Sequence, residues 1–567
     1  MKPIIKIFIL ILLLVPITYE IQAQDDSFST IIDELTPLMV KVESSKFSYS
    51  PEIEIKNNSV LRYSYLKSNI KGTSDDNLGF ELNFADIDAY TVRENTKGDV
   101  ITVDMKIKNN QKLIKTFVND DIKPYTSTLS IVALNIDNAR EIRRLIEKSI
   151  PLAENMLNTR LSLETYQEMI SWLEGNIGKV EEQSADVEQL LRHDSDFPGK
   201  IMLRVLTTGK NSKEEEFTLN LADINENSFS FQISGSQFGL KFETVRKQDL
   251  IGVISNGETK PFTNRIIVET SNVEDARDLR SVLIMAVPEA RKLLDASLTN
   301  YSSAEESLLA FKQELKDVSA GQQSFEQSIE PDCQCSFTIT SASGSKSSTT
   351  IYSLNLMDIN DKFIDFKTSG SKMMIDVDVV QKQKLVAQKK DGEQAAYIST
   401  FSIYGKDTEN ARRLKHILKQ VVEQCHDRYQ YNSPEGNMDD RMTWLKEEMG
   451  SVRIKEKEYS QEISQVDASE PEKFSFTQRV IDSKGSTEHI YELSLSDLDE
   501  NNINYEITGL DLSVKVQTKF KDKIIKYYKD GDIQNYQYSF EIKAKNVEQA
   551  RNLINGLKEM VALAKKG

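Results

Sequence analysis

The sequence predicts an α+β fold made of four tandem units, each an antiparallel β-sandwich or partly open barrel that is closed by a C-terminal helix. Three observations predict it. A short strand motif occurs four times, turn signals follow each occurrence at fixed distances, and a capped amphipathic helix ends each unit. A pattern that recurs at this period indicates one folded unit per repeat.

The strand motif consists of alternating apolar residues that end at an aspartate. Its four occurrences are Leu-Asn-Phe-Ala-Asp, Leu-Asn-Leu-Ala-Asp, Leu-Asn-Leu-Met-Asp and Leu-Ser-Leu-Ser-Asp, which end at Asp86, Asp223, Asp358 and Asp497. These aspartates are offset by 137, 135 and 139 residues. Because side chains on a strand alternate between two faces, this period of two predicts a strand with one buried face.

Two turn signals follow each aspartate. Twelve residues later stands a glycine, as a tight turn with positive φ requires: Gly98, Gly235, Gly370 and Gly509. Thirty-four residues after the aspartate stands a hairpin pair: Asn119-Asp120, Asn256-Gly257, Asp391-Gly392 and Asp530-Gly531. Such pairs favour a type I′ turn, in which both central residues have positive φ. We count six strands per unit, or seven if one run is broken.

A helix closes each unit. Fifty-three residues after each aspartate comes an Ala-Arg pair: Ala139-Arg140, Ala276-Arg277, Ala411-Arg412 and Ala550-Arg551. Four positions before each alanine stands a residue preferred as an N-cap: Asn135, Asn272, Asp407 and Asn546. Apolar residues then recur at helical spacing.

These landmarks divide the chain into nine segments: a signal peptide, a lead-in segment, four repeat units and three connectors. We expect a signal peptide at 1–23, a lead-in segment at 24–45, repeat units at 46–160, 197–300, 333–430 and 472–567, and helical connectors at 161–196, 301–332 and 431–471. The units are called copies 1 to 4 below. The later part of each connector is charged and rich in Gln and Ser, and we interpret it as a solvated helix or spacer.

The N-terminus has the features of an export signal. Lys2 and Lys6 accompany an apolar run from Ile4 to Ile17, and Ala23 offers a cleavage point. This run is shorter than the ~20 residues that a membrane-spanning helix needs. We therefore expect a periplasmic or secreted protein that does not insert into a membrane.

Composition narrows the range of partners. The 567 residues carry a formal net charge of −17, which disfavours nucleic acid as a partner, since nucleic acid attracts positive surfaces. The three cysteines are Cys333, Cys335 and Cys425. In an oxidising compartment Cys425 can pair with either of the other two, and free buried thiols are the alternative.

Each unit resembles the pleckstrin-homology-like fold, on the strength of the Leu-Asn-Leu-x-Asp-Ile strand, the late hairpin and the capped Asn-x-Glu-x-Ala-Arg helix. The resemblance implies a bent β-sandwich of about a hundred residues with a C-terminal helix across one end. It covers the units and excludes the connectors. The fold serves lipid, peptide and protein binders alike, so the resemblance implies no particular site.

Four sets of residues have features of a binding or metal site. Runs such as Asp86-Ile-Asp88 begin like a calcium loop but lack its later ligands, which favours Asx turns. The recurring Asp and Arg predict an ion pair within each unit or an exposed helical arginine, and the functional alternative is a repeated anion- or carboxylate-binding spot. Two lysine clusters are expected to face solvent: Lys382, Lys384, Lys389 and Lys390, and Lys519, Lys521, Lys523, Lys526 and Lys529. His416 and His426 form no zinc motif.

We therefore predict no catalytic, cofactor-binding or metal site and no cofactor. The leading hypothesis is an exported, non-enzymatic, multivalent binding or scaffold protein with unidentified protein partners. The alternative is a carrier of a small apolar or lipid-like ligand. An enzyme confined to one unit is the least favoured hypothesis, because no catalytic motif is present.

Overall fold

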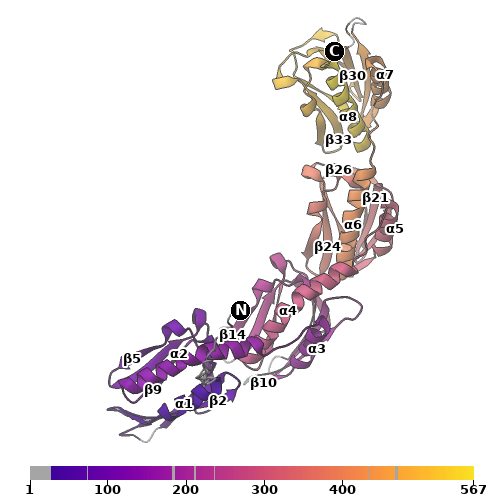
Figure 1. The fold of residues 1–567 in the computed structure, drawn as a ribbon. Helices are drawn as coiled ribbons and strands as arrows, with labels where there is room; N and C mark the ends of the chain where they lie inside the picture. Colours follow the sequence, from indigo (N-terminus) through magenta and orange to yellow (C-terminus); the bar gives the residue numbers. More distant parts are fainter. Residues whose placement is uncertain are drawn as a thin grey trace, which may run out of the picture. The chain divides into compact units, whose positions relative to one another are not determined.

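The structure, a computed structural model, describes residues 27–72, 75–181, 185–209, 212–234, 237–432, 434–466, 470 and 472–566. The predicted signal peptide lies outside these residues. Within them the chain is mixed α+β, with eight α-helices and eight antiparallel sheets in repeating groups of six and three strands (Figure 1). No helix in the described ranges is both long and apolar enough to cross a lipid bilayer.

The first group begins and ends with a helix. Its elements are α1 (Phe28–Leu35), β1 (Val42–Glu43), β2 (Phe47–Asn57), β3 (Val60–Asn69), β4 (Asp75–Asn83), β5 (Arg93–Lys97), β6 (Val100–Lys106), β7 (Ile114–Val118), β8 (Asp121–Thr126), β9 (Thr128–Ala133) and α2 (Ile136–Thr159).

The second group repeats this order. Its elements are α3 (Tyr166–Asn176), β10 (Val180–Glu181), β11 (Ala185–His193), β12 (Lys200–Gly209), β13 (Lys213–Asn220), β14 (Ser230–Ser234), β15 (Gln237–Glu243), β16 (Ile251–Ser255), β17 (Glu258–Thr263), β18 (Arg265–Thr270) and α4 (Val273–Ser297).

The third group has the same order again. Its elements are α5 (Ala304–Glu314), β19 (Val318–Ala320), β20 (Gln323–Glu330), β21 (Gln334–Ser343), β22 (Lys346–Asn355), β23 (Asp365–Ser369), β24 (Lys372–Asp378), β25 (Val386–Lys390), β26 (Glu393–Ile398), β27 (Thr400–Gly405) and α6 (Thr408–Arg428).

The fourth group completes the series. Its elements are α7 (Met438–Met449), β28 (Val452–Ile454), β29 (Lys457–Gln465), β30 (Lys473–Asp482), β31 (Gly485–Ser494), β32 (Asn504–Thr508), β33 (Asp511–Gln517), β34 (Lys526–Lys529), β35 (Asp532–Ile533), β36 (Ser539–Lys543) and α8 (Val547–Ala564).

One strand order recurs in all four groups. The first six-stranded sheet has the order β1-β2-β3-β4-β7-β8, and the first three-stranded sheet has the order β5-β6-β9. In the third group, α6 packs against β24 and β27 on one side and against α5 on another. Figure 1 shows α6 between β24 and β21, with α5 beyond it. The helix therefore packs on the three-stranded sheet and on α5.

The structure has more strands than the sequence predicted, nine per group in place of six or seven. The additional strands lie in the segments predicted to be helical connectors, and that prediction is wrong for their later part. Strands β11, β20 and β29 are the second strands of their sheets. They bury few apolar side chains, for example Phe325 and Ile329 in β20, so their alternation is weak. Pairing with β12, β21 and β30 stabilises them.

The helices of these segments belong to the core. Phe311 of α5 is buried and lies edge-on to Phe337 of β21, with ring centroids 6.0 Å apart. The predicted lead-in segment also contains such a helix, since α1 buries Phe28 against Phe84. The opening helix is thus a structural part of every group.

The turn and cap predictions are confirmed where the residues are described. Gly98, Gly370 and Gly509 have φ of 68°, 61° and 63°, whereas Gly235 lies outside the described residues. All four hairpin pairs have positive φ at both residues, as in Asn256 and Gly257. The predicted N-caps accept hydrogen bonds from backbone N–H groups in the first turn of their helices.

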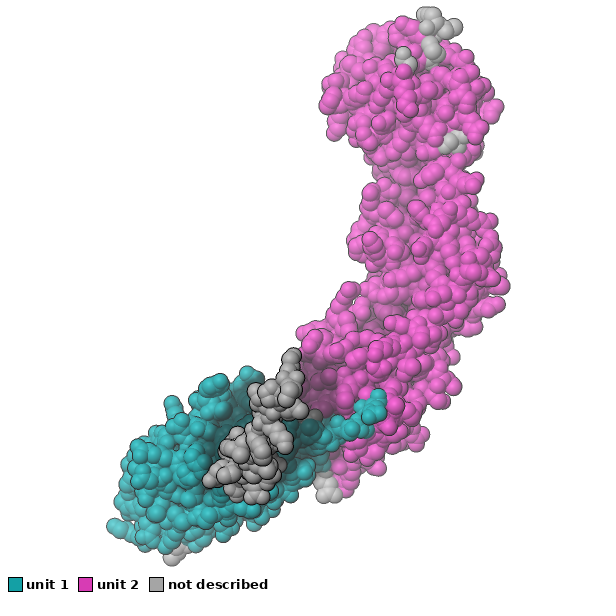
Figure 2. All heavy atoms as spheres, viewed as in Figure 1, with its two compact units in different colours: residues 1–164, 231–239, 269–278 teal, residues 165–230, 240–268, 279–567 magenta. Residues whose placement is uncertain are grey.

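The chain divides into two compact units, shown in Figure 2. Unit 1 comprises residues 1–164, 231–239 and 269–278, and unit 2 comprises residues 165–230, 240–268 and 279–567. Unit 1 thus joins copy 1 to the start of α4 and part of the β14–β15 hairpin, both from copy 2. Its hydrophobic core includes Phe238, Val273 and Ala276 beside the apolar residues of copy 1.

One disulfide crosslinks the third group. Cys333 is bonded to Cys425 of α6, which confirms the expectation of a single bridge and identifies the partner. Cys335 is a free, buried thiol, and burial raises its pKa. The bond joins residues 92 positions apart, so it restricts a long loop in the unfolded chain.

We expect the native chain to be inert to a thiol reagent, and the denatured, unreduced chain to expose one thiol, that of Cys335. The double substitution C333S/C425S should lower the free energy of unfolding by about 4.6 kcal/mol, the chain-entropy estimate for a loop of this length. Thiol titration and chemical denaturation measure the two effects. Three reactive thiols without a reductant would contradict the assignment.

Candidate interaction site: the junction between successive copies

The aspartate of the repeated motif ends a short 3-10 turn that follows the strand. The turns are η2 (Phe84–Asp86), η5 (Leu221–Asp223), η8 (Leu356–Asp358) and η11 (Leu495–Asp497). In the first three, the side-chain oxygen of the preceding asparagine accepts the N–H of the middle turn residue, as Asn83 does from Ala85. This Asx turn ends the strand one residue after the leucine and directs the aspartate away from the sheet.

Each of the first three aspartates pairs with the arginine of the following copy. Arg277 donates two hydrogen bonds to Asp86, at 2.9 and 2.5 Å, across 191 residues of sequence. Arg412 pairs with Asp223 at 3.0 and 2.6 Å, and Arg551 pairs with Asp358 at 2.7 and 2.5 Å. The predicted pair within one copy is therefore wrong: the same two residue types join adjacent copies.

All three pairs are bidentate and largely buried, with side chains that are 12% and 10%, 12% and 10%, and 8% and 6% exposed. The arginine lies in the second turn of the closing helix, so the carboxylate of the preceding copy lies near the helix N-terminus, where the dipole stabilises negative charge. The planar guanidinium presents two parallel N–H groups to the two carboxylate oxygens, a geometry that lysine cannot offer. The pair thus holds the start of one copy's closing helix against the 3-10 turn of the preceding copy.

Burial and the opposite charge of the partner shift the pKa values of these side chains in opposite directions. Burial acts against the charge on Arg412, but the attraction and hydrogen bonds of Asp223, with those of Glu409, raise its pKa above the ordinary value. The pKa of Arg277 and of Arg551 is raised in the same way. Burial also raises the pKa of Asp86 and Asp358, because it outweighs the effect of the arginine. Such a pair specifies geometry more than it adds net stability.

A second hydrogen bond crosses two of the junctions. Asn220 donates to Glu409 at 3.0 Å, and Asn355 donates to Glu548 at 3.3 Å. Glu409 also accepts from Arg412 at 3.2 Å, so one network connects the asparagine, the glutamate and the arginine. The sequence analysis did not predict this contact between copies, although the pattern of residues at the two positions could have indicated it. The asparagine is replaced only in the last copy, by Ser494, and the glutamate only in the first, by Asp137.

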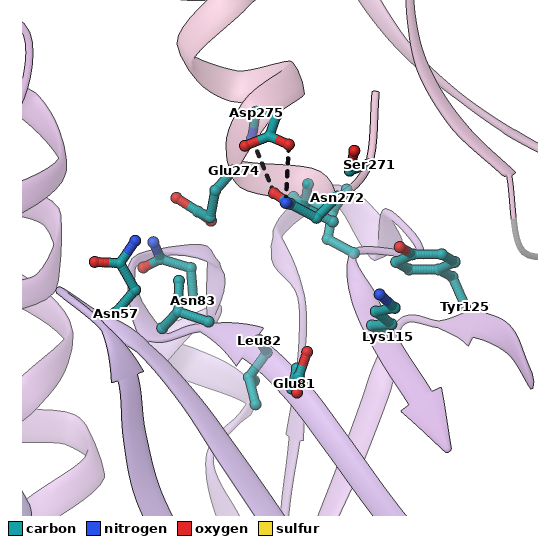
Figure 3. A pocket seen from close by; sticks show the side chains of 13 residues that line it. Asn57, Glu81, Leu82, Asn83, Lys115, Tyr125, Ser271, Asn272, Glu274 and Asp275 are labelled. Atoms are coloured by element: carbon teal, nitrogen blue, oxygen red, sulfur yellow. Dashed lines mark hydrogen bonds between the residues drawn. The ribbon is translucent and has the colours of Figure 1, made fainter. Parts of the chain in front are cut away.

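The first junction differs from the other two. Glu274 pairs with Arg160 at 2.6 Å, and the amide nitrogen of buried Asn83 has no hydrogen-bond partner among the described residues. Asn83 lines a cavity of about 350 Å³ inside unit 1. In Figure 3, Asn57, Asn83 and Glu274 gather on one side of it, and Lys115 and Tyr125 lie on the other. Its amide, ammonium and carboxylate groups suit a small polar ligand.

An equivalent cavity of about 380 Å³ lies at the second junction, in unit 2. Asn220, Phe262, Lys406 and Glu409 are among the residues that line it. Phe262 occupies the position of Tyr125, and Glu409 that of Glu274. The two cavities therefore result from the shared junction geometry.

The other candidate residues take structural roles. Asp88, Asn225, Asn360 and Asp499 cap short 3-10 turns, which confirms the Asx-turn interpretation for the second acidic position. The two lysine clusters are mostly exposed, and Lys526 lies 3.5 Å from Glu492. His416 bonds to the carbonyl of Thr299. Across the described residues no three His, Cys, Asp or Glu side chains form a group suited to a metal ion.

No family model, curated protein or solved structure matches this chain.

The three buried arginines have a matched control in copy 1, because Arg140 occupies the same position but is exposed. We expect Arg551→Met to lower the free energy of unfolding by about 3–5 kcal/mol, since it leaves the carboxylate of Asp358 buried without its partner. Arg140→Met should change it by less than about 0.5 kcal/mol. Urea denaturation followed by circular dichroism measures both. Equal effects would contradict the proposed role of the pair.

Proposed function

We propose that the protein is an exported, non-enzymatic scaffold in which four modules, one per sequence copy, form a multivalent binding chain. The observation that carries this proposal is the threefold recurrence of the buried Asp–Arg junction. A junction that fixes orientation turns separate modules into a continuous support. Several binding surfaces on one support gain avidity, because each later contact is intramolecular.

The exposed surface supplies candidate contact points that differ between copies. Tyr90, Phe363 and Phe520 are large aromatic side chains exposed on short 3-10 turns. Exposed aromatic residues anchor many protein interfaces, since they provide a large contact area with few rotatable bonds. The equivalents of Tyr90 in the other copies are Asn227, Lys362 and Asn501, so the shared fold does not require an aromatic residue there.

Phe520 has a second unusual property. Its φ is 53°, and the same left-handed conformation occurs at Asn109, Arg246 and Gln381 in the other copies. All four copies have this conformation at the equivalent position, but it is less favourable in free energy for phenylalanine than for asparagine. The presence of a bulky aromatic side chain at a strained and exposed position supports a role for Phe520 in binding.

A groove beside Tyr90 supports a binding role for copy 1. It has a volume of about 320 Å³ and is lined by Tyr90, Arg93, Lys97 and Lys106, with Asp104 and parts of β6 and β9. Basic side chains beside an exposed tyrosine suit an acidic or carbonyl-rich segment of a protein partner.

Export is part of the proposal. The N-terminal segment has the composition of a signal peptide, and the Cys333–Cys425 bond suits a periplasmic or extracellular location, where disulfides persist. Within each module, a β-sandwich closed by a helix, as in the pleckstrin-homology-like fold, is likewise proposed. The alternative is a carrier of a small apolar or lipid-like ligand, and the two junction cavities, which are lined by apolar side chains as well as charged and amide groups, are its candidate sites.

Affinity capture from an envelope extract of the source organism tests the proposal. The bait is the mature chain from Gln24, beside a triple variant Tyr90→Ser, Phe363→Ser and Phe520→Ser. We expect the wild type to retain a defined protein partner and the triple variant to bind it about a hundredfold or more weakly, through loss of avidity.

The control is the triple variant Asn227→Ser, Lys362→Ser and Asn501→Ser, which changes exposed residues at the position of Tyr90 in the other copies. It should bind as the wild type does. Unchanged capture by the aromatic variant would exclude those residues as the contact. If no protein is retained and a small apolar molecule is extracted from the purified chain, the carrier hypothesis replaces the scaffold.

A further inference from the structure

Each internal junction joins two different surfaces. The aspartate face of one copy contains the motif aspartate, an apolar residue twenty-seven positions later and an aromatic residue thirty-nine positions later. The arginine face of the next copy contains the arginine and the first residue of the closing helix, which is apolar at the first and third junctions (Val273 and Val547) and is Thr408 at the second. Among the described residues, the aspartate face of copy 4 and the arginine face of copy 1 take part in no such junction.

The aspartate face of copy 4 is exposed at positions that the other copies bury. Ile524 is 47% exposed, whereas its equivalents Leu113, Leu250 and Leu385 are 3%, 4% and 3% exposed. Tyr536 is 48% exposed, whereas its equivalents Tyr125 and Tyr397 are each 4% exposed. The side chain of Asp497 makes no ion pair or hydrogen bond with the residues that the structure describes, whereas those of Asp86, Asp223 and Asp358 pair with arginine.

Contacts at the internal junctions explain the difference. The ring of Tyr125 lies 5.4 Å from that of Phe238 in the next copy. The backbone N–H groups of Phe262 and Tyr397 donate to Gly370 and Gly509, the turn glycines of their following copies. The aromatic position therefore meets the next copy at all three junctions. Tyr536 has the same side chain and lacks that neighbour.

The arginine face of copy 1 is exposed in the same way. The side chain of Arg140 is 66% exposed, whereas those of Arg277, Arg412 and Arg551 are 12%, 12% and 8% exposed. Ile136 is 41% exposed, whereas its equivalents Val273 and Val547 are each 8% exposed. Arg140 contacts only Asp137 of its own helix turn, at 3.2 Å, among the described residues.

We propose that the chain associates head to tail with a second copy of itself, with the aspartate face of copy 4 of one molecule on the arginine face of copy 1 of another. Asp497 pairs with Arg140, and Tyr536 and Ile524 are covered together with Ile136. The two faces have opposite charges at the centre and apolar residues beside it, as the internal junctions do. The contact is heterologous, so repetition produces rings or filaments.

Two substitutions make this contact weaker than an internal junction. Ser494 replaces the asparagine and Asp137 the glutamate, so the hydrogen bond between asparagine and glutamate at the second and third junctions cannot form. Two separate molecules also lose translational and rotational freedom when they associate, which costs free energy. The copies of one chain are already linked, so their junctions do not have this cost. It is therefore reversible and depends on concentration.

Charge reversal tests the proposal directly in the full mature chain, with purification tags removed. Sedimentation velocity should show concentration-dependent assembly of the wild type. Arg140→Glu and Asp497→Arg should each weaken it at least about thirtyfold, because each places like charges in contact and leaves the partner unpaired. Arg144→Glu, one turn further along α2, and Asp532→Arg, at an exposed hairpin, are matched controls and should assemble normally.

Complementation separates this contact from a loss of folding. A mixture of the Arg140→Glu and Asp497→Arg chains should assemble, and so should the double variant R140E/D497R, because both restore opposite charges across the contact. A wild type that stays monomeric up to its highest soluble concentration would overturn the proposal. Assembly that persists in both single variants, or that is not recovered in the mixture, would also overturn it.

Discussion

The structure depends on a buried guanidinium–carboxylate pair between successive copies. A carboxylate that loses water needs a partner of fixed geometry, and arginine provides two parallel N–H groups to meet it. The aspartate ends the strand-to-turn motif and the arginine lies in the second turn of the closing helix, so the pair connects the turn of one copy to the helix of the next. The pair specifies how the copies meet, while apolar burial supplies most of the stability.

The remaining junction contacts follow from this arrangement. The closing helix must present its first turns to the preceding copy, so its N-cap and acidic residue are conserved in type through the chain. The asparagine that ends the strand is close enough to donate to the glutamate at the second and third junctions. At the first junction Glu274 accepts a hydrogen bond from Arg160. The side-chain N–H group of Asn83 has no partner among the described residues, and Asn83 lines the cavity there. Small changes around a constant ion pair therefore give each junction its own surface.

Sequence patterns predicted the local elements well and the assembly poorly. The turns at Gly370 and Asn256-Gly257 and the helix start at Asn546 need backbone conformations or caps that few residue types favour, so these elements could be predicted from the residue type. Strand β20 was missed because it buries only two apolar residues of eight, and a paired neighbour supplies the rest of its stability. The Asp–Arg partner could not be read from spacing, since pairing within a copy and between copies repeats with the same period. The loss of Asn only in copy 4 and of Glu only in copy 1 was the available signal.

The most direct test is a pair of double-mutant cycles that share Asp358. One cycle combines Asp358→Leu with Arg551→Met, and the other combines it with Arg412→Met, the arginine of the same copy. The account predicts a coupling energy above about 2 kcal/mol for Asp358 with Arg551, and near zero, within about 0.5 kcal/mol, for Asp358 with Arg412. Coupling to Arg412 in place of Arg551 would show that the pair lies within a copy, and would contradict the account.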